Sequence, residues 1–245
     1  MTDWFNTVLF GIYPYICLAV FFIGSWMRFD RDQYAWKPGP APLLRKGTRR
    51  WGSNLFHCGV LFLFFGHAFG MLTPHFLYEG LISTGSKQLL AMVCGGIAGV
   101  IALIGLTMLL VRRLGDERIR ATSKFSDILL LWLLWIQLAL GLATIPLSAQ
   151  HLDGSVMVSL AEWAQRLLTF RSGGVELLAG KSWVFKAHMF LGMTLFLIFP
   201  FTRLVHVWSG FATLGYLRRP YQLVRARRLN LPADRQTPTR RNGAA

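Results

Sequence analysis

Four of the six histidines lie inside apolar stretches, where an imidazole side chain is costly. Hydrocarbon cannot replace the hydrogen bonds that water gives to a polar group, so ionisable residues within membrane segments usually mark a functional site with a partner. Two of these histidines fall in each of two stretches, which suggests two buried metal centres. We predict that each centre is a haem iron held from both sides by neutral imidazoles. The four residues are His57, His67, His188 and His206.

Helix geometry decides whether these histidines can share cofactors. An α-helix turns by ~100° per residue, so the 18 residues between His188 and His206 bring both onto one stripe. His57 and His67 are ten residues apart and differ by about 80°, which leaves both on one half of their helix. The two stretches are the second and fifth of five, so their helices run antiparallel. His57 therefore shares one side of the membrane with His206, and His67 shares the other with His188.

The axial rise fits this pairing less well, since ten residues span ~15 Å of helix and eighteen span ~27 Å. We expect helix tilt, the reach of the imidazoles and a kink at Pro200 to absorb the difference. Two alternatives stay open. A membrane histidine can simply bond to a neighbouring helix, and zinc could replace haem iron, although structural zinc sites cluster four nitrogen or sulfur ligands.

The elements that position these histidines are predicted to be membrane-spanning helices. The sequence has 53% hydrophobic residues, nine Trp, nineteen Phe and only 15% charged residues, which excludes a disordered chain and an ordinary soluble domain. Five stretches are long enough to cross ~30 Å of hydrocarbon as helices. We therefore predict an all-α integral membrane protein with five transmembrane helices, over residues 5–27, 53–72, 89–111, 128–147 and 184–204.

The positions of the basic residues give the expected orientation. Of the 26 Lys and Arg, seven lie within residues 28–50, five within 112–124 and nine from 203 onward. The other two connections together carry only five. By the positive-inside rule, the N-terminus lies outside and the C-terminus in the cytoplasm. Because topology explains the net charge of +15, we do not expect nucleic-acid binding.

Small and basic residues near the histidines are candidate cofactor contacts. A porphyrin between helices needs small neighbours, and Gly59, Gly66 and Gly70 lie along one face of the second stretch. Of these we predict Gly66 as a cofactor-binding position; for each glycine singly, close helix packing is the alternative. Arg112 and Arg203 are predicted partners of haem propionates, although both could simply mark the membrane interface.

The remaining sequence adds little chemistry. We predict one membrane domain over residues 1–228, because no linker or repeat separates the helices. Residues 229–245 are polar with little to bury, so a flexible C-terminal tail is expected. Residues 156–168 show apolar periodicity and predict an amphipathic helix on the membrane surface. His75 and His151 lie in or near outer connections, where water can satisfy them, and are not predicted as ligands.

Several segments resemble the gamma subunit of respiratory nitrate reductase, a membrane di-haem cytochrome b. The resemblance covers nearly the full length and is specific, because no ordinary membrane helix offers these motifs together. The segments that carry it are 11–15 (GIYPY), 24–30 (GSWMRFD), 54–57 (NLFH), 66–75 (GHAFGMLTPH), 145–154 (IPLSAQHLDG), 199–208 (FPFTRLVHVW) and 221–227 (YQLVRAR).

This resemblance implies two b-type haems in a bacterial inner-membrane protein. Positions matching His67 and His188 hold the outer-side haem iron, and those matching His57 and His206 hold the cytoplasmic-side one, in agreement with the pairing above. It also implies a quinol site beside the outer haem with a functional lysine at Lys87. From the residue alone, a lysine reaching the interface would be the simpler interpretation.

The implied function is quinol oxidation at the outer side, with electrons passing through the two haems to a cytoplasmic iron–sulfur beta subunit. That subunit supplies a molybdenum-containing alpha subunit that reduces nitrate. A six-coordinate iron with two imidazoles suits electron transfer, since it has no open position for substrate. Two alternatives stay open: a related quinol-linked cytochrome b of another complex, for instance in sulfur metabolism, and a haem-free transporter or scaffold.

Overall fold

The structure is a computed structural model, which describes residues 2–32, 47–78, 80–121 and 123–208. These residues form helices joined by turns, as predicted for an all-α protein. Within them, five helical spans are long and apolar enough to cross a membrane. The predicted boundary between a membrane domain (1–228) and a tail (229–245) lies outside the described residues. The spans are Trp4–Arg31, Arg50–Leu72, Thr84–Gly115, Phe125–Ser148 and Trp183–Phe201.

The first span combines three helical elements in a continuous run. It starts with α1 (Thr2–Thr7), passes through a π-helical turn (Val8–Ile12) and continues as α2 (Tyr13–Asp32). The later spans are α3 (Gly47–Leu72), α5 (Thr84–Gly115), α7 (Phe125–Ser148) and α9 (Trp183–Ile198).

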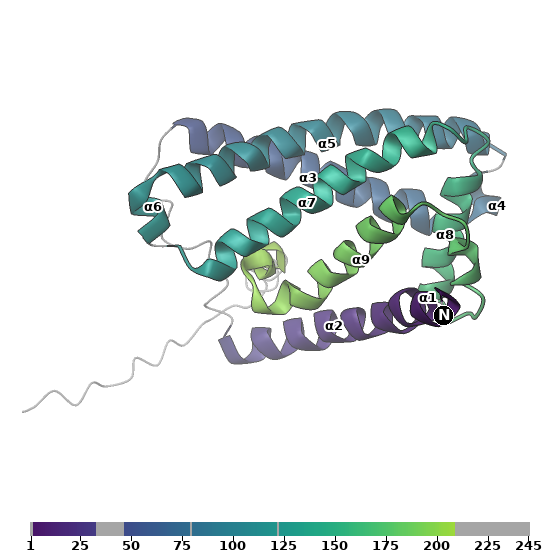
Figure 1. Cartoon of the computed structure of the whole chain (residues 1–245), viewed down its shortest axis with the longest axis horizontal. Coiled ribbons are helices and arrows are strands. Elements are labelled where there is room, and N and C mark those ends of the chain that lie inside the picture. The colour runs from purple at the N-terminus through teal and green to yellow at the C-terminus, as the bar shows by residue number, and fades with distance from the viewer. Residues whose placement is uncertain (1, 33–46, 79, 122, 209–245) are drawn as a thin grey trace, which may run out of the picture.

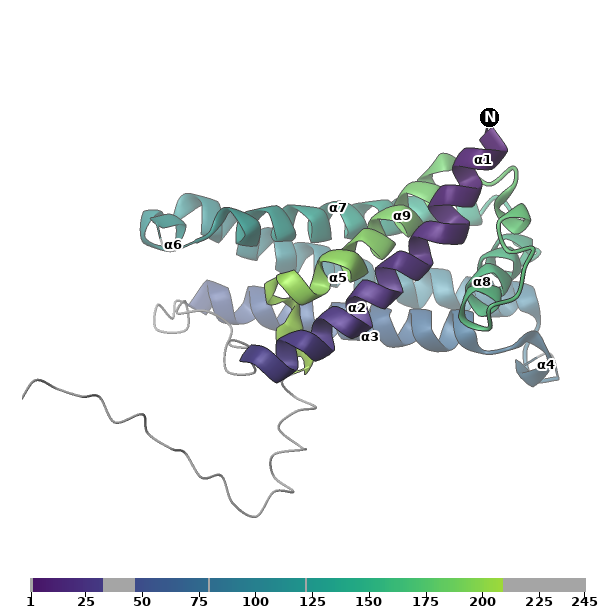
Figure 2. The ribbon, with the colours of Figure 1, turned by 90° about the horizontal axis from the view of Figure 1, so that it is seen from below.

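Neighbouring spans pack in the order α3, α5, α7, α9, α2 (Figure 1). In Figure 2, α2 and α9 run side by side and are inclined to α3. The α3–α5 contact is close because Gly59 has no side chain: a Cβ there would lie 2.7 Å from the Ala98 carbonyl oxygen. Small residues allow such close approach between membrane helices. Gly59 therefore serves helix packing and does not share the surroundings of Gly66.

The outward surface of the bundle is apolar. Phe22 on α2, Phe64 on α3 and Ile97 on α5 expose 60%, 57% and 61% of their surface. A soluble monomer rarely exposes so many large apolar side chains together. This surface suits a protein whose surrounding solvent is hydrocarbon, and it supports the predicted transmembrane fold class.

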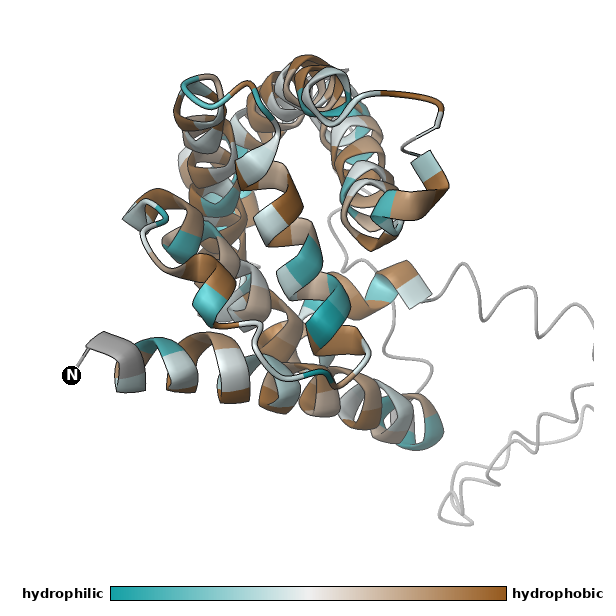
Figure 3. Cartoon of the chain, turned by 90° about the vertical axis from the view of Figure 1, so that its right-hand side faces the viewer, coloured by the Kyte–Doolittle hydropathy of each residue, from teal (hydrophilic) through white to brown (hydrophobic). Residues whose placement is uncertain are grey.

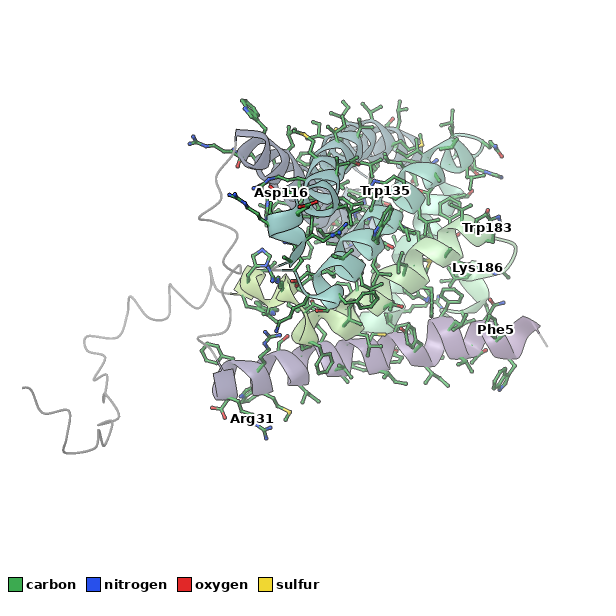
Figure 4. The ribbon with its side chains drawn as sticks, turned by 60° about the vertical axis from the view of Figure 1, so that its left-hand side comes forward. Phe5, Arg31, Asp116, Trp135, Trp183 and Lys186 are labelled. Atoms are coloured by element: carbon green, nitrogen blue, oxygen red, sulfur yellow. The ribbon has the colours of Figure 1, made fainter. Side chains whose placement is uncertain are left out.

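The connections lie at two opposite ends of the bundle. We call one the α6 end, after α6 (Glu117–Ala121), and the other the α8 end, after α8 (Ser155–Leu168), where α4 (His75–Tyr78) also lies (Figure 1). Figure 4 shows Arg31 and Asp116 toward the α6 end and Phe5, Trp183 and Lys186 toward the opposite end. Successive spans therefore alternate in direction, and α3 runs antiparallel to α9.

The amphipathic helix expected at residues 156–168 is α8, but its apolar side packs on protein. Trp163 is 4% exposed, and its indole Nε1 donates to the carbonyl oxygen of Phe10, 3.1 Å away. Buried Leu167 and Leu178 complete this small core. The apolar face of α8 is covered by α2, α3 and the 3-10 turn Glu176–Leu178, so protein occupies the side that we expected to rest on the membrane surface. Figure 3 looks onto this end of the bundle.

Candidate metal centres

The structure brings the four predicted histidines together in two pairs. At the α6 end, the ring centroids of His57 and His206 are 6.1 Å apart, with an angle of 72° between the ring planes. At the α8 end, the ring centroids of His67 and His188 are 6.3 Å apart, with an angle of 39°. One ring of each pair comes from α3. The other is His188 of α9 or His206, which begins the helical stretch 206–208 after two 3-10 turns. The pairing is the one that the antiparallel arrangement requires.

All four imidazoles hold Nδ1 against a backbone carbonyl oxygen. A carbonyl can only accept a hydrogen bond, so Nδ1 is the donor, and a ring with no second N–H has its lone pair on Nε2. Metal-binding histidines in proteins are typically oriented by such a bond at the other ring nitrogen. The carbonyls belong to Ser53 for His57 (2.7 Å), Leu63 for His67 (2.7 Å), Gln137 for His188 (3.2 Å) and Arg203 for His206 (2.5 Å).

The spacing of each pair fits one metal ion between two imidazoles. A metal–nitrogen bond of about 2.0 Å, with the ring centre about 1.1 Å further on, puts two opposed ring centroids about 6 Å apart. Both measured separations agree with this value. Among the described residues, no group of three or more His, Cys, Asp or Glu side chains could hold a metal ion. The donor set therefore fits haem iron, whose porphyrin supplies the other four ligands, and does not fit a structural zinc site.

His188 is held by contacts from the neighbouring span α7. Gln137 accepts from His188 Nδ1 with its backbone oxygen, and its side-chain Nε2 donates to the His188 carbonyl at 3.1 Å. Gly141, one turn further along α7, faces the ring: a Cβ there would lie 3.0 Å from His188 Cε1. Gln137 was not among the predicted site residues, although a single amide within an apolar span is a signal that could have revealed it.

His206 does not lie on a continuation of α9. The helix ends at Ile198 and is followed by two 3-10 turns, Phe199–Phe201 and Arg203–Val205. Between them, Thr202 is extended, with φ −113° and ψ −179°. The kink predicted at Pro200 is thus the end of the α-helix. The span ends at Phe201, three residues before the predicted end at residue 204. Proline lacks the N–H that would continue the ladder.

The two predicted propionate partners lie at the α6 end. Arg203 forms an ion pair with the buried Asp127 carboxylate at 2.5 Å, and Arg113 lies 3.6 Å from the same oxygen. Arg112 lies beside Arg113 in the last turn of α5. The Arg203 guanidinium is therefore already paired within the protein, a partner that the sequence did not reveal.

Gly66 lies directly before His67 on α3, and a Cβ built there would meet no atom within 4 Å. The same holds for Gly70 one turn later. Among the described residues, both positions thus face open space, whereas Gly59 packs directly against α5.

Lys87 lies in the first turn of α5, at the α8 end. Its Nζ stands 3.4 Å from the centroid of the Tyr78 ring, a cation–π contact. The His75 ring lies 5.0 Å from the same tyrosine, and His75 Nε2 is 3.2 Å from Thr84 Oγ1. His151 lies in the connection before α8, where its carbonyl accepts from Gln88 Nε2 at 2.7 Å. His75 and His151 thus belong to the connections at this end.

Comparisons with known proteins agree along almost the whole chain. The family model "Nitrate reductase gamma subunit" matches residues 6–227. The respiratory nitrate reductase 2 gamma chain of Escherichia coli (strain K12) is 54% identical over 229 residues, which cover 93% of this chain and 100% of that protein. The respiratory nitrate reductase 1 gamma chain of the same strain is 53% identical over 91% of this chain and 98% of its own length. The nitrate reductase gamma chain of Bacillus subtilis (strain 168) is 38% identical over 90% of this chain and 98% of its own length.

Proposed function

The chain belongs to the nitrate reductase gamma subunit family, and on this premise we propose that it oxidises quinol and carries two b-type haems. Membership makes it a membrane subunit of respiratory nitrate reductase, an oxidoreductase complex with alpha and beta partner chains. The five apolar spans agree with a place in the inner membrane. Of the alternatives, a cytochrome b from a complex of another kind loses its support.

The observation that carries the proposal is the geometry of the two histidine pairs. Each pair offers two imidazoles, oriented by Nδ1 bonds and spaced for one metal ion. His57 and His206 would hold one haem iron, and His67 and His188 the other. The haems, when bound, supply one-electron transfer from quinol toward the partner subunits. Gly66 would leave room beside His67. Arg112 would bind a propionate, and Arg203 would do so with the guanidinium nitrogens that its ion pair with Asp127 does not use.

Quinol is proposed to bind near Lys87 at the α8 end. An ammonium held on the Tyr78 ring stands where it can donate a hydrogen bond to a quinol oxygen. The His67/His188 pair is the one at this end of the bundle, so the electron acceptor and the substrate site share one side. Protons from quinol would leave on that side.

The basic α6 end is proposed to face the cytoplasm. It carries the cluster 112–124 with its five basic residues, and cytoplasmic connections are the ones enriched in Lys and Arg. The N-terminus, at the opposite end, would then lie outside. An iron–sulfur beta subunit would dock on this cytoplasmic face, close to His57 and His206, and pass electrons to a molybdenum-containing alpha subunit.

Spectroscopy of the purified complex tests the proposal. We expect two low-spin ferric haem signals and a b-type reduced-minus-oxidised optical spectrum, with both haems reduced by added quinol as well as by dithionite. Fewer than two bis-imidazole signals would refute the haem assignment. Reduction by dithionite but not by quinol would refute the quinol-oxidising role and leave the haem assignment standing.

A further inference from the structure

His206 needs support that the other three histidines do not. His57, His67 and His188 lie inside long α-helices, whereas His206 is the first residue of a helical stretch (206–208) that follows two 3-10 turns and the extended residue Thr202. When a helix ends, its last carbonyl groups lose their N–H partners and must find others. A ring on such a segment keeps its direction only if the segment itself is fixed.

Arg28 of α2 supplies one support. Its Nη1 donates to the carbonyl oxygens of Pro200 at 2.5 Å and of Thr202 at 3.1 Å, which brackets the first turn after α9. A cation is also favoured at a helix C-terminus by the helix dipole. The close approach is possible because of Gly24, one turn earlier, where a Cβ would come within 2.9 Å of Pro200 Cγ.

Asp127 of α7 supplies the second support, from the opposite side of the segment. It is 6% exposed and binds the Arg203 guanidinium at 2.5 Å, with Arg113 at 3.6 Å. The backbone oxygen of Arg203 in turn accepts from His206 Nδ1 at 2.5 Å. The carboxylate therefore fixes the residue whose carbonyl orients the imidazole.

We propose that Arg28 and Asp127 are positioning residues that together clamp segment 199–206 and so hold the His206 ring opposite His57. This inference rests on the proposed function, because it assigns the clamp to one of two haem centres. The clamp works through charged hydrogen bonds, which are stronger than neutral ones and more selective in geometry. The His67/His188 pair has no contact with Arg28 or Asp127 among the bonds described, so the two centres should respond differently.

The test compares neutral variants with matched controls in the whole complex. Arg28→Gln and Asp127→Asn remove the two charges. In the unmodified protein, the backbone N–H of Lys124 donates to Asp127 Oδ2 at 3.3 Å, and the asparagine keeps an oxygen that can accept this bond. The controls are Arg31→Gln, one turn further along α2, and Glu117→Gln on α6, both exposed. Low-spin ferric signals, midpoint potentials and haem content are measured for each centre.

We expect the His57/His206 signal to shift and broaden in both neutral variants, because that signal depends on the angle between the ring planes. Haem retention at this centre should weaken about 10-fold, as is usual when a residue behind a metal ligand is lost. Arg28→Lys and Asp127→Glu should restore part of the signal, since each keeps the charge. Signal, potential and haem content at the His67/His188 centre should stay as in the controls.

An unchanged His57/His206 centre in both neutral variants overturns the clamp. Equal loss of both centres also overturns it, because that outcome means general destabilisation without positioning. If a neutral variant does not accumulate, its charge-preserving variant decides: it must affect the His57/His206 centre alone. Failure of the proposed two-haem function can be distinguished from failure of the clamp, because the unmodified complex itself would then lack two bis-imidazole signals.

Discussion

At the α8 end, His67 and His188 both sit on regular α-helices, whereas at the α6 end His206 follows a helix that has already ended. The first pair is held by close packing: Gly141 lets α7 approach the His188 ring, and Gln137 bonds to the same residue. The second is held by charged side chains, Arg28 and the Asp127–Arg203 ion pair.

The two proposed ligand pairs are therefore positioned by two different means. Where both rings lie on regular helices, within about a turn and a half of the helix ends, small residues and backbone bonds orient the ring. Near the end of a span, charged residues can reach the interface and can fix irregular backbone. Packing substitutions should therefore disturb the α8-end pair, and charge substitutions the α6-end pair.

The largest difference between the two ends is expected when one proposed ligand is removed. In His67→Gln we expect loss of the α8-end low-spin signal and a fall in quinol-driven nitrate reduction of more than about 100-fold, beyond the loss seen for residues behind a ligand. The α6-end signal should persist. Electron paramagnetic resonance and turnover with quinol measure both effects.

The matched control is His75→Gln, which changes a histidine in the connection at the same end. It should retain both low-spin signals. Survival of the α8-end signal in His67→Gln would contradict the ligand assignment.

Lys87→Ala tests the proposed quinol site without changing the His67/His188 pair at the same end. Loss of one charged hydrogen bond of about 1.5–3 kcal/mol should slow quinol-driven haem reduction by about 10- to 100-fold. Reduction by dithionite should be unchanged, since both histidine pairs stay in place. Stopped-flow absorbance with each reductant measures the two rates. Lys181→Ala, in the connection before α9, is the control; normal quinol oxidation in Lys87→Ala would rule out the proposed quinol site.

Gly141→Ala tests whether close packing by itself holds the His188 ring. The added methyl would stand 3.0 Å from His188 Cε1, so the ring or α7 must move. We expect a shifted α8-end signal, an unchanged α6-end signal and destabilisation of about 1–3 kcal/mol, as for other overpacked sites. Spectra and thermal unfolding of the complex measure these changes.

Gly95→Ala on α5 is the control, because a Cβ there meets no atom within 4 Å. It should leave both signals unchanged, and alanine should favour the helix by up to about 1 kcal/mol. Identical α8-end signals in Gly141→Ala and the unmodified protein would argue against packing as the means of holding His188.

The smallest effect is expected at Asp153, which lies in the connection before α8, away from both pairs. Hydrogen bonds from Ser155 Oγ at 2.9 Å and Ser155 N at 3.2 Å lower the pKa of this carboxyl. A lowered pKa in the folded state means that the bonds stabilise the fold above the unfolded pKa of about 4, and that this stability is lost as the pH falls through that region.

Asp153→Asn should therefore be slightly less stable than the unmodified protein at pH 7, and the difference should shrink as the pH falls below about 4. Thermal unfolding at several pH values measures it. Both haem signals should be unchanged at neutral pH, and a difference in stability that grows on acidification would contradict the assignment.

Residue type and spacing were enough to predict much of the site. Apolar length gave five spans, and the structure has helices at all five. The antiparallel direction of the second and fifth spans determined which histidines pair, and the structure brings those rings to 6.1 and 6.3 Å. These features could be predicted because helix period and rise depend on backbone geometry alone.

The features that could not be predicted from the sequence are contacts between residues on different spans or turns. Pro200 indicated a disturbance in the last span, but only the structure shows that the helix ends at Ile198. The pairing of Arg203 with Asp127 joins residues 76 positions apart, and α8 was assigned to the membrane surface although protein covers its apolar side. Local composition cannot reveal such contacts.

Residue types and their spacing are thus sufficient to predict the helices, their directions and which histidines pair, because burial of apolar residues and the α-helical repeat act locally along the chain. Only the tertiary structure decided how each imidazole is aimed. That depends on a carbonyl, a glycine or a guanidinium brought from a distant span, and such encounters exist only once the spans have packed together.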